Sequence, residues 1–234
     1  MLSKLIILTA TLLITFWSNK IGMVSCQSVT CPLQGETCLC PSFFFVKKMY
    51  INCSATSIAA AFPKSDVAKM LLPFQSKEKY IYLNNKNWLS IPTNAFESLQ
   101  NIMQLDLGSN SLREVQEKAF VGLGSTLFHL SLKMNLLEVV KSGMFATLGK
   151  LTTLDLSNNR IRLVETSTFK ELGLLDRLYI GFNNITLLSN GTFLGLASLT
   201  EFDFLHNSLA LARAESFVGL SRLAVLHLHF QGLR

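Results

Sequence analysis

A repeat of about 24 residues constrains this chain more strongly than any other feature of its sequence. Its clearest copy has the sequence LTTLDLSNNRI from Leu151, and Phe169 and Leu172 follow in the same copy. Copies begin near residues 78, 102, 127, 151, 175, 199 and 223, so the spacings are 24, 25, 24, 24, 24 and 24 residues. A register kept over so many copies indicates a solenoid, in which each copy is one coil and buries its apolar side chains against the next coil.

Each copy contains a short segment with the alternation of a β-strand. In Leu154-Asp155-Leu156 the two leucines are expected to point inward and Asp155 outward. Strands of successive coils are expected to pair in parallel about 4.8 Å apart, while the rest of each copy returns along the opposite side of the coil. The sequence therefore predicts an α/β solenoid with a parallel sheet on its concave face and an irregular or 3-10 helical convex side.

Two further positions of the repeat predict structural roles for their side chains. The ninth position is asparagine in five consecutive copies, and an inward amide can satisfy backbone groups of its own and adjacent coils. The nineteenth position is phenylalanine, and such periodic rings are expected to stack as a convex-side spine rather than to form a functional row. The asparagines are Asn110, Asn135, Asn159, Asn183 and Asn207, and the phenylalanines are Phe96, Phe120, Phe145, Phe169, Phe193 and Phe217.

The complete pattern, LxxLxLxxNxLxxLxxxxFxxLxx, resembles the 24-residue extracellular form of the leucine-rich-repeat family over residues 78–234. The resemblance implies a horseshoe-shaped solenoid that binds other molecules. Ahead of the repeats, Cys31-x6-Cys38-x-Cys40-x12-Cys53 resembles the N-terminal cysteine cap of Toll-like receptors, Slit-type proteins, the Nogo receptor and lamprey variable lymphocyte receptors. The pairing in that family implies disulfides Cys31–Cys40 and Cys38–Cys53, although the interval between the first two cysteines is slightly long.

Residues 27–77 are expected to form this cysteine-rich cap followed by an insert. The part from Ser54 to Lys77 departs from the family, because it runs on through Val67 to Phe74 before the first repeat strand. An irregular or helical conformation is expected there. A cap is also a physical requirement, since the first coil would otherwise expose its apolar core to water.

Residues 1–26 have the pattern of a secretory signal peptide. Lys4 precedes an apolar run from Leu5 to Phe16, and small residues precede a predicted cut after Cys26. A run of twelve residues is too short for a helix across the roughly 30 Å core of a bilayer, so a retained membrane anchor is the weaker alternative. Removal of Cys26 would leave four cysteines that can pair completely, whereas an earlier cut would leave it as a spare thiol.

The charge of the chain is mildly basic. The formal net charge is +6, and removal of Lys4 and Lys20 with the signal peptide gives 6 − 2 = +4. No run of lysine or arginine occurs, so this balance favours solubility over nucleic-acid binding. Nucleic acid is therefore not an expected partner.

The last predicted repeat is truncated after its strand half, at Arg234. Leu226, Leu228 and Leu233 would then be partly uncovered, so the sequence is interpreted as a fragment of a longer protein. A membrane tether would come only from C-terminal sequence beyond this point. Secreted and membrane-anchored forms both remain open alternatives.

No motif for catalysis, a cofactor or a metal is found in the sequence. His206, His227 and His229 could together form a zinc site, but exposed histidines on a binding wall are the simpler interpretation. Asp106, Asp155 and Asp203 recur at one outward position that is commonly polar and solvated, which argues against a catalytic carboxylate pair. The protein is therefore not expected to be an enzyme, and no cofactor is expected.

Three Asn-x-Ser/Thr sequons are consistent with passage through the secretory pathway. They begin at Asn52, Asn184 and Asn190. Asn190 is expected to be the best acceptor because it should lie beyond the strand on a connecting arm. Asn184 adjoins a structural asparagine, and Asn52 adjoins a cysteine.

The outward strand positions should form columns on the concave face, and the last three repeats bring large side chains into them. Aromatic residues dominate the energetics of protein interfaces, so this cluster is the predicted ligand-binding site. The alternative is that Phe182 and Phe230 fold back against the edge of the coil. The predicted binding residues are Arg177, Tyr179, Phe182, His206, His227 and Phe230.

These features predict an extracellular or cell-surface binding module, the ectodomain fragment of a recognition receptor. Its expected partner is an extracellular protein or a microbial ligand. The resemblance to Toll-like and lymphocyte receptors implies a role in innate immunity. The alternative is a secreted matrix protein whose repeats organise other extracellular proteins.

Overall fold

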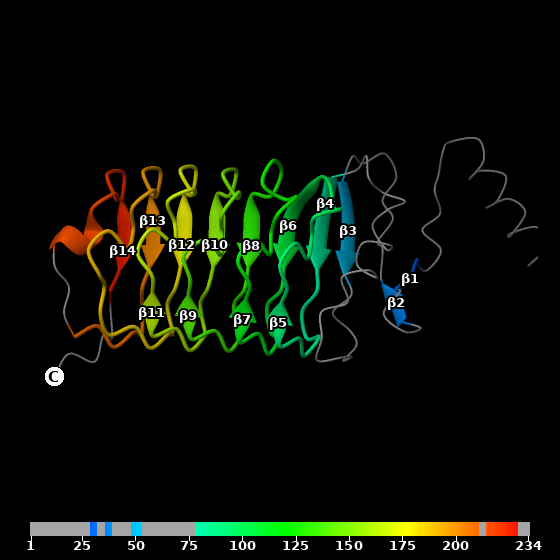
Figure 1. The fold of residues 1–234 in the computed structure, drawn as a ribbon, viewed down its shortest axis with the longest axis horizontal. Helices are drawn as coiled ribbons and strands as arrows, with labels where there is room; N and C mark the ends of the chain where they lie inside the picture. Colours follow the sequence, from blue (N-terminus) through cyan, green and yellow to red (C-terminus); the bar gives the residue numbers. More distant parts are fainter. Residues whose placement is uncertain (1–28, 32–35, 39–47, 53–77, 211–213, 229–234) are drawn as a thin grey trace, which may run out of the picture.

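The computed structural model describes residues 29–31, 36–38, 48–52, 78–210 and 214–228, and its main feature is an eight-stranded parallel sheet (Figure 1). Each predicted repeat contributes one strand, so the predicted solenoid with a parallel sheet is confirmed. In order along the sheet the strands are β3 (Lys48–Asn52), β4 (Glu78–Tyr82), β6 (Ile102–Asp106), β8 (His129–Ser131), β10 (Thr153–Asp155), β12 (Arg177–Tyr179), β13 (Glu201–Asp203) and β14 (Val225–His227).

The strands pair in the register that the repeat predicts. Leu154 of β10 pairs with Leu130 of β8 and Leu178 of β12, so equivalent positions form columns across the sheet. Leu154 and Leu156 are completely buried, whereas Asp155 is partly exposed. The expected alternation of inward and outward side chains is therefore confirmed.

The N-terminal end of the sheet departs from the regular period. β4 pairs with β6 through a register shift between Lys79 and Tyr80. β3 then extends the sheet by one strand that the repeat pattern did not predict, with Ile51 paired to Ile81 and buried. Thirty residues separate the starts of β3 and β4 instead of 24, so this strand falls outside the period.

Other predictions for the N-terminal region are tested only in part or not at all. β1 (Val29–Cys31) and β2 (Glu36–Cys38) form a separate antiparallel pair. The signal segment 1–26, the segment 53–77 and the side chains needed for the Cys31–Cys40 and Cys38–Cys53 disulfides lie outside the described residues. The cysteine cap and its pairing therefore stay predictions.

The side of the coils opposite the main sheet is built from turns and very short strands. β5 (Ser90–Ile91) pairs with β7 (Glu114–Val115), and β9 (Val139–Val140) pairs with β11 (Leu163–Val164), along the lower part of the view in Figure 1. One 3-10 helix, η2 (Ala214–Phe217), lies near the C-terminal end. Within the ranges that the structure describes, no helix is long and apolar enough to cross a membrane.

The five asparagines link each coil to the one before it. Asn159 is typical: its Nδ2 donates to the carbonyl oxygens of Leu132 and Leu156 at 3.0 Å, and its Oδ1 accepts from the Leu137 backbone N–H at 3.1 Å. Leu132 and Leu137 belong to the preceding coil. Because the same bonds recur at all five positions, the predicted structural role is confirmed, and we name the set Asn110, Asn135, Asn159, Asn183 and Asn207 the asparagine ladder.

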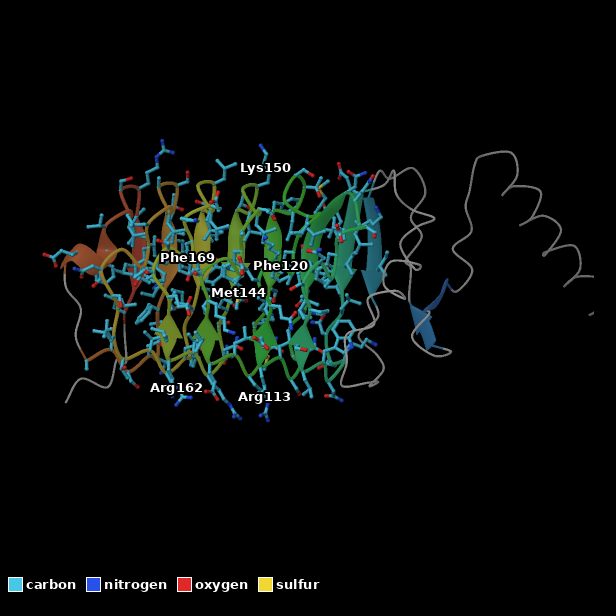
Figure 2. The ribbon with its side chains drawn as sticks, in the orientation of Figure 1. Arg113, Phe120, Met144, Lys150, Arg162 and Phe169 are labelled. Atoms are coloured by element: carbon cyan, nitrogen blue, oxygen red, sulfur yellow. The ribbon has the colours of Figure 1, made fainter. Side chains whose placement is uncertain are left out.

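The phenylalanines stack inside the coils. Consecutive rings have centroids 5.8–6.4 Å apart, and the rings from Phe96 to Phe193 are completely buried. Figure 2 shows Phe120 and Phe169 within the body of the solenoid, while Lys150, Arg113 and Arg162 project from its edges. The predicted packing spine is therefore confirmed, and these rings are not available as a functional surface.

Replacement of Asn159 by alanine tests the contribution of the asparagine ladder. The Leu137 N–H and the Leu132 carbonyl would lose a buried partner, so the free energy of unfolding should fall by about 2–4 kcal/mol. Urea denaturation followed by circular dichroism measures this loss. The matched control is Asn158→Gly at the adjacent exposed position, where φ is 55° and glycine fits; an equal loss in both variants would contradict the assigned role.

Candidate functional site

The candidate site lies on the outward surface of the main sheet, which we name the sheet face. We define it by four positions of each coil: two outward strand residues, and the two residues that follow the second buried leucine. The second strand position forms a column of Tyr82, Asp106, Ser131, Asp155, Tyr179, Asp203 and His227. The last position forms a column of Asn85, Ser109, Met134, Asn158, Phe182 and His206, directly before the asparagine ladder position.

Every residue in this last column has a left-handed backbone, with φ between 50° and 58°. Asparagine tolerates this conformation well, but a bulky side chain does not. Met134 and Phe182 nevertheless occupy the column with 55% and 47% of their surface exposed. Because neither residue is favoured by local backbone energy or by burial, we take these two positions as candidates for a surface role.

Phe182 and His206 form the centre of the aromatic end of the sheet face. Their rings stack with centroids 4.3 Å apart and an interplanar angle of 20°. Phe182 is nearly half exposed, and its ring rests on that of His206 in the next coil. Tyr179 lies three residues before Phe182 and is joined to His227 through Asp203 in the same column, whereas Phe230 lies outside the described residues.

Charged side chains border the aromatic end. Arg177 lies next to Asp176, with Nε 3.5 Å from Oδ2. Burial and the nearby negative charge of Glu201 raise the pKa of Tyr179, so its phenol remains protonated at neutral pH. Arg177 thus lies at the edge of the aromatic group, as predicted, and Tyr179 presents a hydroxyl group there.

The outward aspartates have a structural role that the sequence analysis missed. Oδ1 of Asp106 accepts from the N–H of Gly108 at 2.8 Å, and Asp155 and Asp203 make the equivalent bond two residues ahead at 2.9 Å. This is the local turn that an aspartate side chain forms with its own backbone. The recurrence of Asp at this position of the repeat was the sequence signal that could have predicted the turn. The geometry gives no support for a catalytic pair.

The histidines do not form a metal cluster within the described ranges. His206 stacks on Phe182, His227 lies on β14, and His229 falls outside those ranges. No group of three His, Cys, Asp or Glu side chains suited to a metal ion is present in the part of the chain that the structure describes. The alternative zinc site therefore gains no support.

His129 is a residue of the sheet face that the sequence analysis did not single out. It lies on β8 at the first outward position, near the middle of the sheet. Burial lowers its pKa, partly offset by the charges of Asp106 and Asp155. His129 is therefore predominantly neutral at pH 7.

Two predicted glycosylation positions are exposed outside the four positions that define the sheet face. Asn184 is exposed directly after the ladder residue Asn183, and Asn190 is exposed on the return arm. The hydroxyl of Thr192, in the sequon that begins at Asn190, donates to the Ser189 carbonyl at 2.8 Å. Asn52 lies at the end of β3, and its side chain is outside the described part of the structure.

A shallow cleft of about 370 Å³ opens on the opposite side of the coils, between β7 and β9. Its two carboxylates already form ion pairs: Glu114 with Lys141 at 2.8 Å, and Glu138 with Arg162. The walls are mostly exposed charged side chains. The sheet face remains the stronger candidate because it has exposed aromatic anchors.

Comparison with known proteins identifies the repeat. A sequence model of the family described as leucine rich repeat matches residues 79–128, 125–185 and 174–233, and no curated protein matches. The chain is similar to the protein of a TLR13–ssRNA13 complex, with 22% identity and a TM-score of 0.56 over 77% of this chain and 28% of the other. It is also similar to a Drosophila Toll–Spatzle complex, with 22% identity and a TM-score of 0.56 over 64% of this chain and 25% of the other.

Both comparisons with solved structures show the fold alone. The chain spans about a quarter of the length of these structures. Neither structure supports the expectation that nucleic acid is not a partner, because one is an ssRNA complex and the other a protein complex.

Replacement of Phe182 by asparagine tests whether this residue serves the surface rather than the fold. Asparagine tolerates the φ of 56°, so the free energy of unfolding should stay unchanged or rise by about 1 kcal/mol. Urea denaturation measures it, with the buried Phe169→Leu variant as a destabilised reference. A loss above about 2 kcal/mol for Phe182→Asn would mean that Phe182 is a packing residue.

Proposed function

The chain belongs to the leucine-rich-repeat family, and we propose that it is an extracellular recognition module that binds a protein partner on its sheet face. The observation that carries this proposal is the exposed Phe182, held in a left-handed conformation and stacked on His206. An exposed aromatic anchor on a rigid scaffold suits a protein interface. The binding residues of the proposal are Arg177, Tyr179, Phe182, His206, His227 and Phe230.

The charge of the sheet face supports a protein partner over a nucleic acid. Its outward positions from Tyr80 to His227 carry the acidic residues Asp106, Asp155, Glu201 and Asp203 and the basic residues Lys133 and Arg177, a net charge of 2 − 4 = −2 with histidine neutral. The whole chain carries +6. Because nucleic acids are bound chiefly through their phosphates, an acidic surface disfavours them.

The proposed biological setting is the ectodomain of a recognition receptor in innate immunity, with an extracellular protein or microbial ligand. The fold shared with the Toll-like structures supports this setting only by analogy. The second candidate, a matrix protein that organises other extracellular proteins, uses the same binding face. In both cases the protein acts by binding rather than by catalysis.

Passage through the secretory pathway completes the proposal. The signal-like residues 1–26, the four cysteines that remain after Cys26 and the exposed positions of Asn184 and Asn190 support it. Residues 27–77 would form the disulfide-bonded cap, and residues 78–234 the repeats.

Expression of the unmodified chain in a mammalian cell line tests this passage. We expect protein in the medium that begins at Gln27 and carries N-glycans at Asn184 and Asn190. N-terminal sequencing and mass spectrometry after enzymatic deglycosylation measure both features. Retention inside the cell with residues 1–26 intact would contradict the proposal, and the Thr186→Val and Thr192→Val variants assign each glycan.

Binding to a panel of extracellular proteins, with single-stranded RNA as a further arm, tests the sheet face itself. The secreted chain should bind at least one protein, and Phe182→Ala and His206→Ala should each weaken that binding by about tenfold or more. Surface plasmon resonance measures the change. The matched control is Leu187→Ala, which removes a side chain that is 55% exposed away from the sheet face. Binding that is lost only in the control variant, or binding of RNA alone, would overturn the proposal.

A further inference from the structure

We propose that the middle of the sheet face holds a site for one basic side chain of the partner, formed by Asn84, Asp106, Ser131 and Asp155. We name these four residues the acceptor strip. The inference rests on the proposed function, since it specifies the chemistry of the partner on that face. It concerns a different part of the face from the aromatic end around Phe182 and His206.

Two buried polar atoms in the strip have no hydrogen-bond partner among the described residues: Oγ of Ser131 and Oδ1 of Asn84. Ser131 is only 3% exposed, yet it points outward, because Leu130 and Leu132 on either side are completely buried in the core. The Nδ2 of Asn84 donates to Oδ2 of Asp106 at 3.0 Å, which fixes the amide so that Oδ1 is the unsatisfied atom. Unsatisfied buried polar groups are rare and costly in native proteins, so these two atoms are acceptors with capacity for a donor.

The two carboxylates flank Ser131 on neighbouring strands. Ser131 pairs directly with Asp106 on one side and Asp155 on the other, so each carboxylate-bearing strand is about 4.8 Å away. Backbone N–H groups hold both carboxylates in place, and the Ser157 hydroxyl also donates to Asp155 at 2.6 Å. Since an ionised carboxylate accepts about four hydrogen bonds, both retain capacity for a further donor.

The charges around the strip leave it negative. No lysine or arginine of the described ranges forms an ion pair with Asp106 or Asp155, and Arg177 pairs with Asp176 instead. Lys133 and Arg177 are the two cations that act on His129 beside the strip, and Arg177 is paired with Asp176, so two negative charges meet one unpaired positive charge. Burial lowers the pKa of His129, so this residue adds no positive charge at pH 7. The charges of Asp106 and Asp155 act to raise that pKa, and those of Arg177 and Lys133 act to lower it.

These atoms define the chemistry of the ligand. Every unsatisfied or charged group in the strip accepts hydrogen bonds, and the net charge is negative. An ammonium group offers three donors and a guanidinium group five, and neither has an acceptor that would oppose the carboxylates. An anion would be repelled, and an apolar group would leave Ser131 unsatisfied. A lysine or arginine side chain of the partner therefore fits the site.

The test uses the secreted chain and three small probes: Nα-acetyl-lysine methylamide, Nα-acetyl-arginine methylamide, and the neutral Nα,Nε-diacetyl-lysine methylamide. NMR of the imidazole resonances of His129 reports binding, because His129 adjoins the strip. We expect saturable shifts with at least one cationic probe at a Kd of about 1–10 mM, as for a single group, and none with the neutral probe. Equal shifts with all three probes, or with none, would overturn the inference.

Two variants and a matched control assign the shifts to the strip. Asp155→Asn keeps an oxygen for the Ser157 N–H but removes the charge, and should weaken binding of the cationic probe at least fivefold. Ser131→Ala should also weaken it, without loss of thermal stability, because the hydroxyl has no protein partner to lose. Asp203→Asn is the control, since Asp203 makes the same bond to its own turn at 2.9 Å but lies outside the strip. Unchanged binding in Asp155→Asn would contradict the site.

The outcome separates this inference from the proposed function. If protein binding depends on Phe182 but the probes do not bind, the sheet face is the interface and the acceptor strip is not a cation site. If the probes bind at the strip but no protein partner depends on Phe182, the strip stands and the aromatic interface fails.

Discussion

The hydrogen bonds of the asparagine ladder are the constraint on which the rest of the structure depends. Each ladder amide joins backbone groups of two successive coils, as Asn159 does with Leu132, Leu137 and Leu156. These bonds require the chain to turn sharply after each strand, and the residue before each ladder asparagine accordingly has a positive φ. The backbone of the sheet face is thus determined by contacts buried beneath it, and its side chains are free to differ from coil to coil.

This separation explains how a regular solenoid carries an irregular surface. The buried positions repeat with little change, because stacked leucines and phenylalanines fill the same volume in each coil. The exposed column before the ladder contains asparagine, serine, methionine, phenylalanine and histidine in the same conformation. Bulky residues there cost backbone energy that the ladder offsets, so the position tolerates Phe182 without collapse of the turn.

The sequence predicted those features that depend on the period alone. The strands, the asparagine ladder and the phenylalanine spine each follow from one position of the repeat, so Asn159 or Phe169 could be assigned without coordinates. β3 could not, because it lies 30 residues before β4 and the chain between the two strands does not keep the repeat. Of the predicted aromatic group, Phe182 and His206 are neighbours in one column, and their rings stack. Phe230 falls outside the described residues.

Features that depend on neighbouring strands were missed for a different physical reason. The burial of Ser131 results from what surrounds it on the flanking coils, and a serine in one repeat gives no sign of this. The same holds for His129, whose pKa is lowered by burial among residues far apart in sequence. The turn formed by Asp106 is local, so the sequence alone could have predicted it. The acceptor strip that Asp106 joins could not be predicted, because its residues come from different coils.

The fixed spacing of the coils finally limits how a partner can use both regions of the sheet face. The acceptor strip has Ser131 on β8, and the aromatic end begins after β12, two strands further along the sheet. At about 4.8 Å per strand this is roughly 10 Å, which about three residues of an extended segment span. A partner segment lying across the strands therefore meets both regions only if a basic residue and a large apolar residue are about three positions apart. Because the ladder fixes the spacing of the coils, it also determines how far apart these two residues must be in the sequence of the partner.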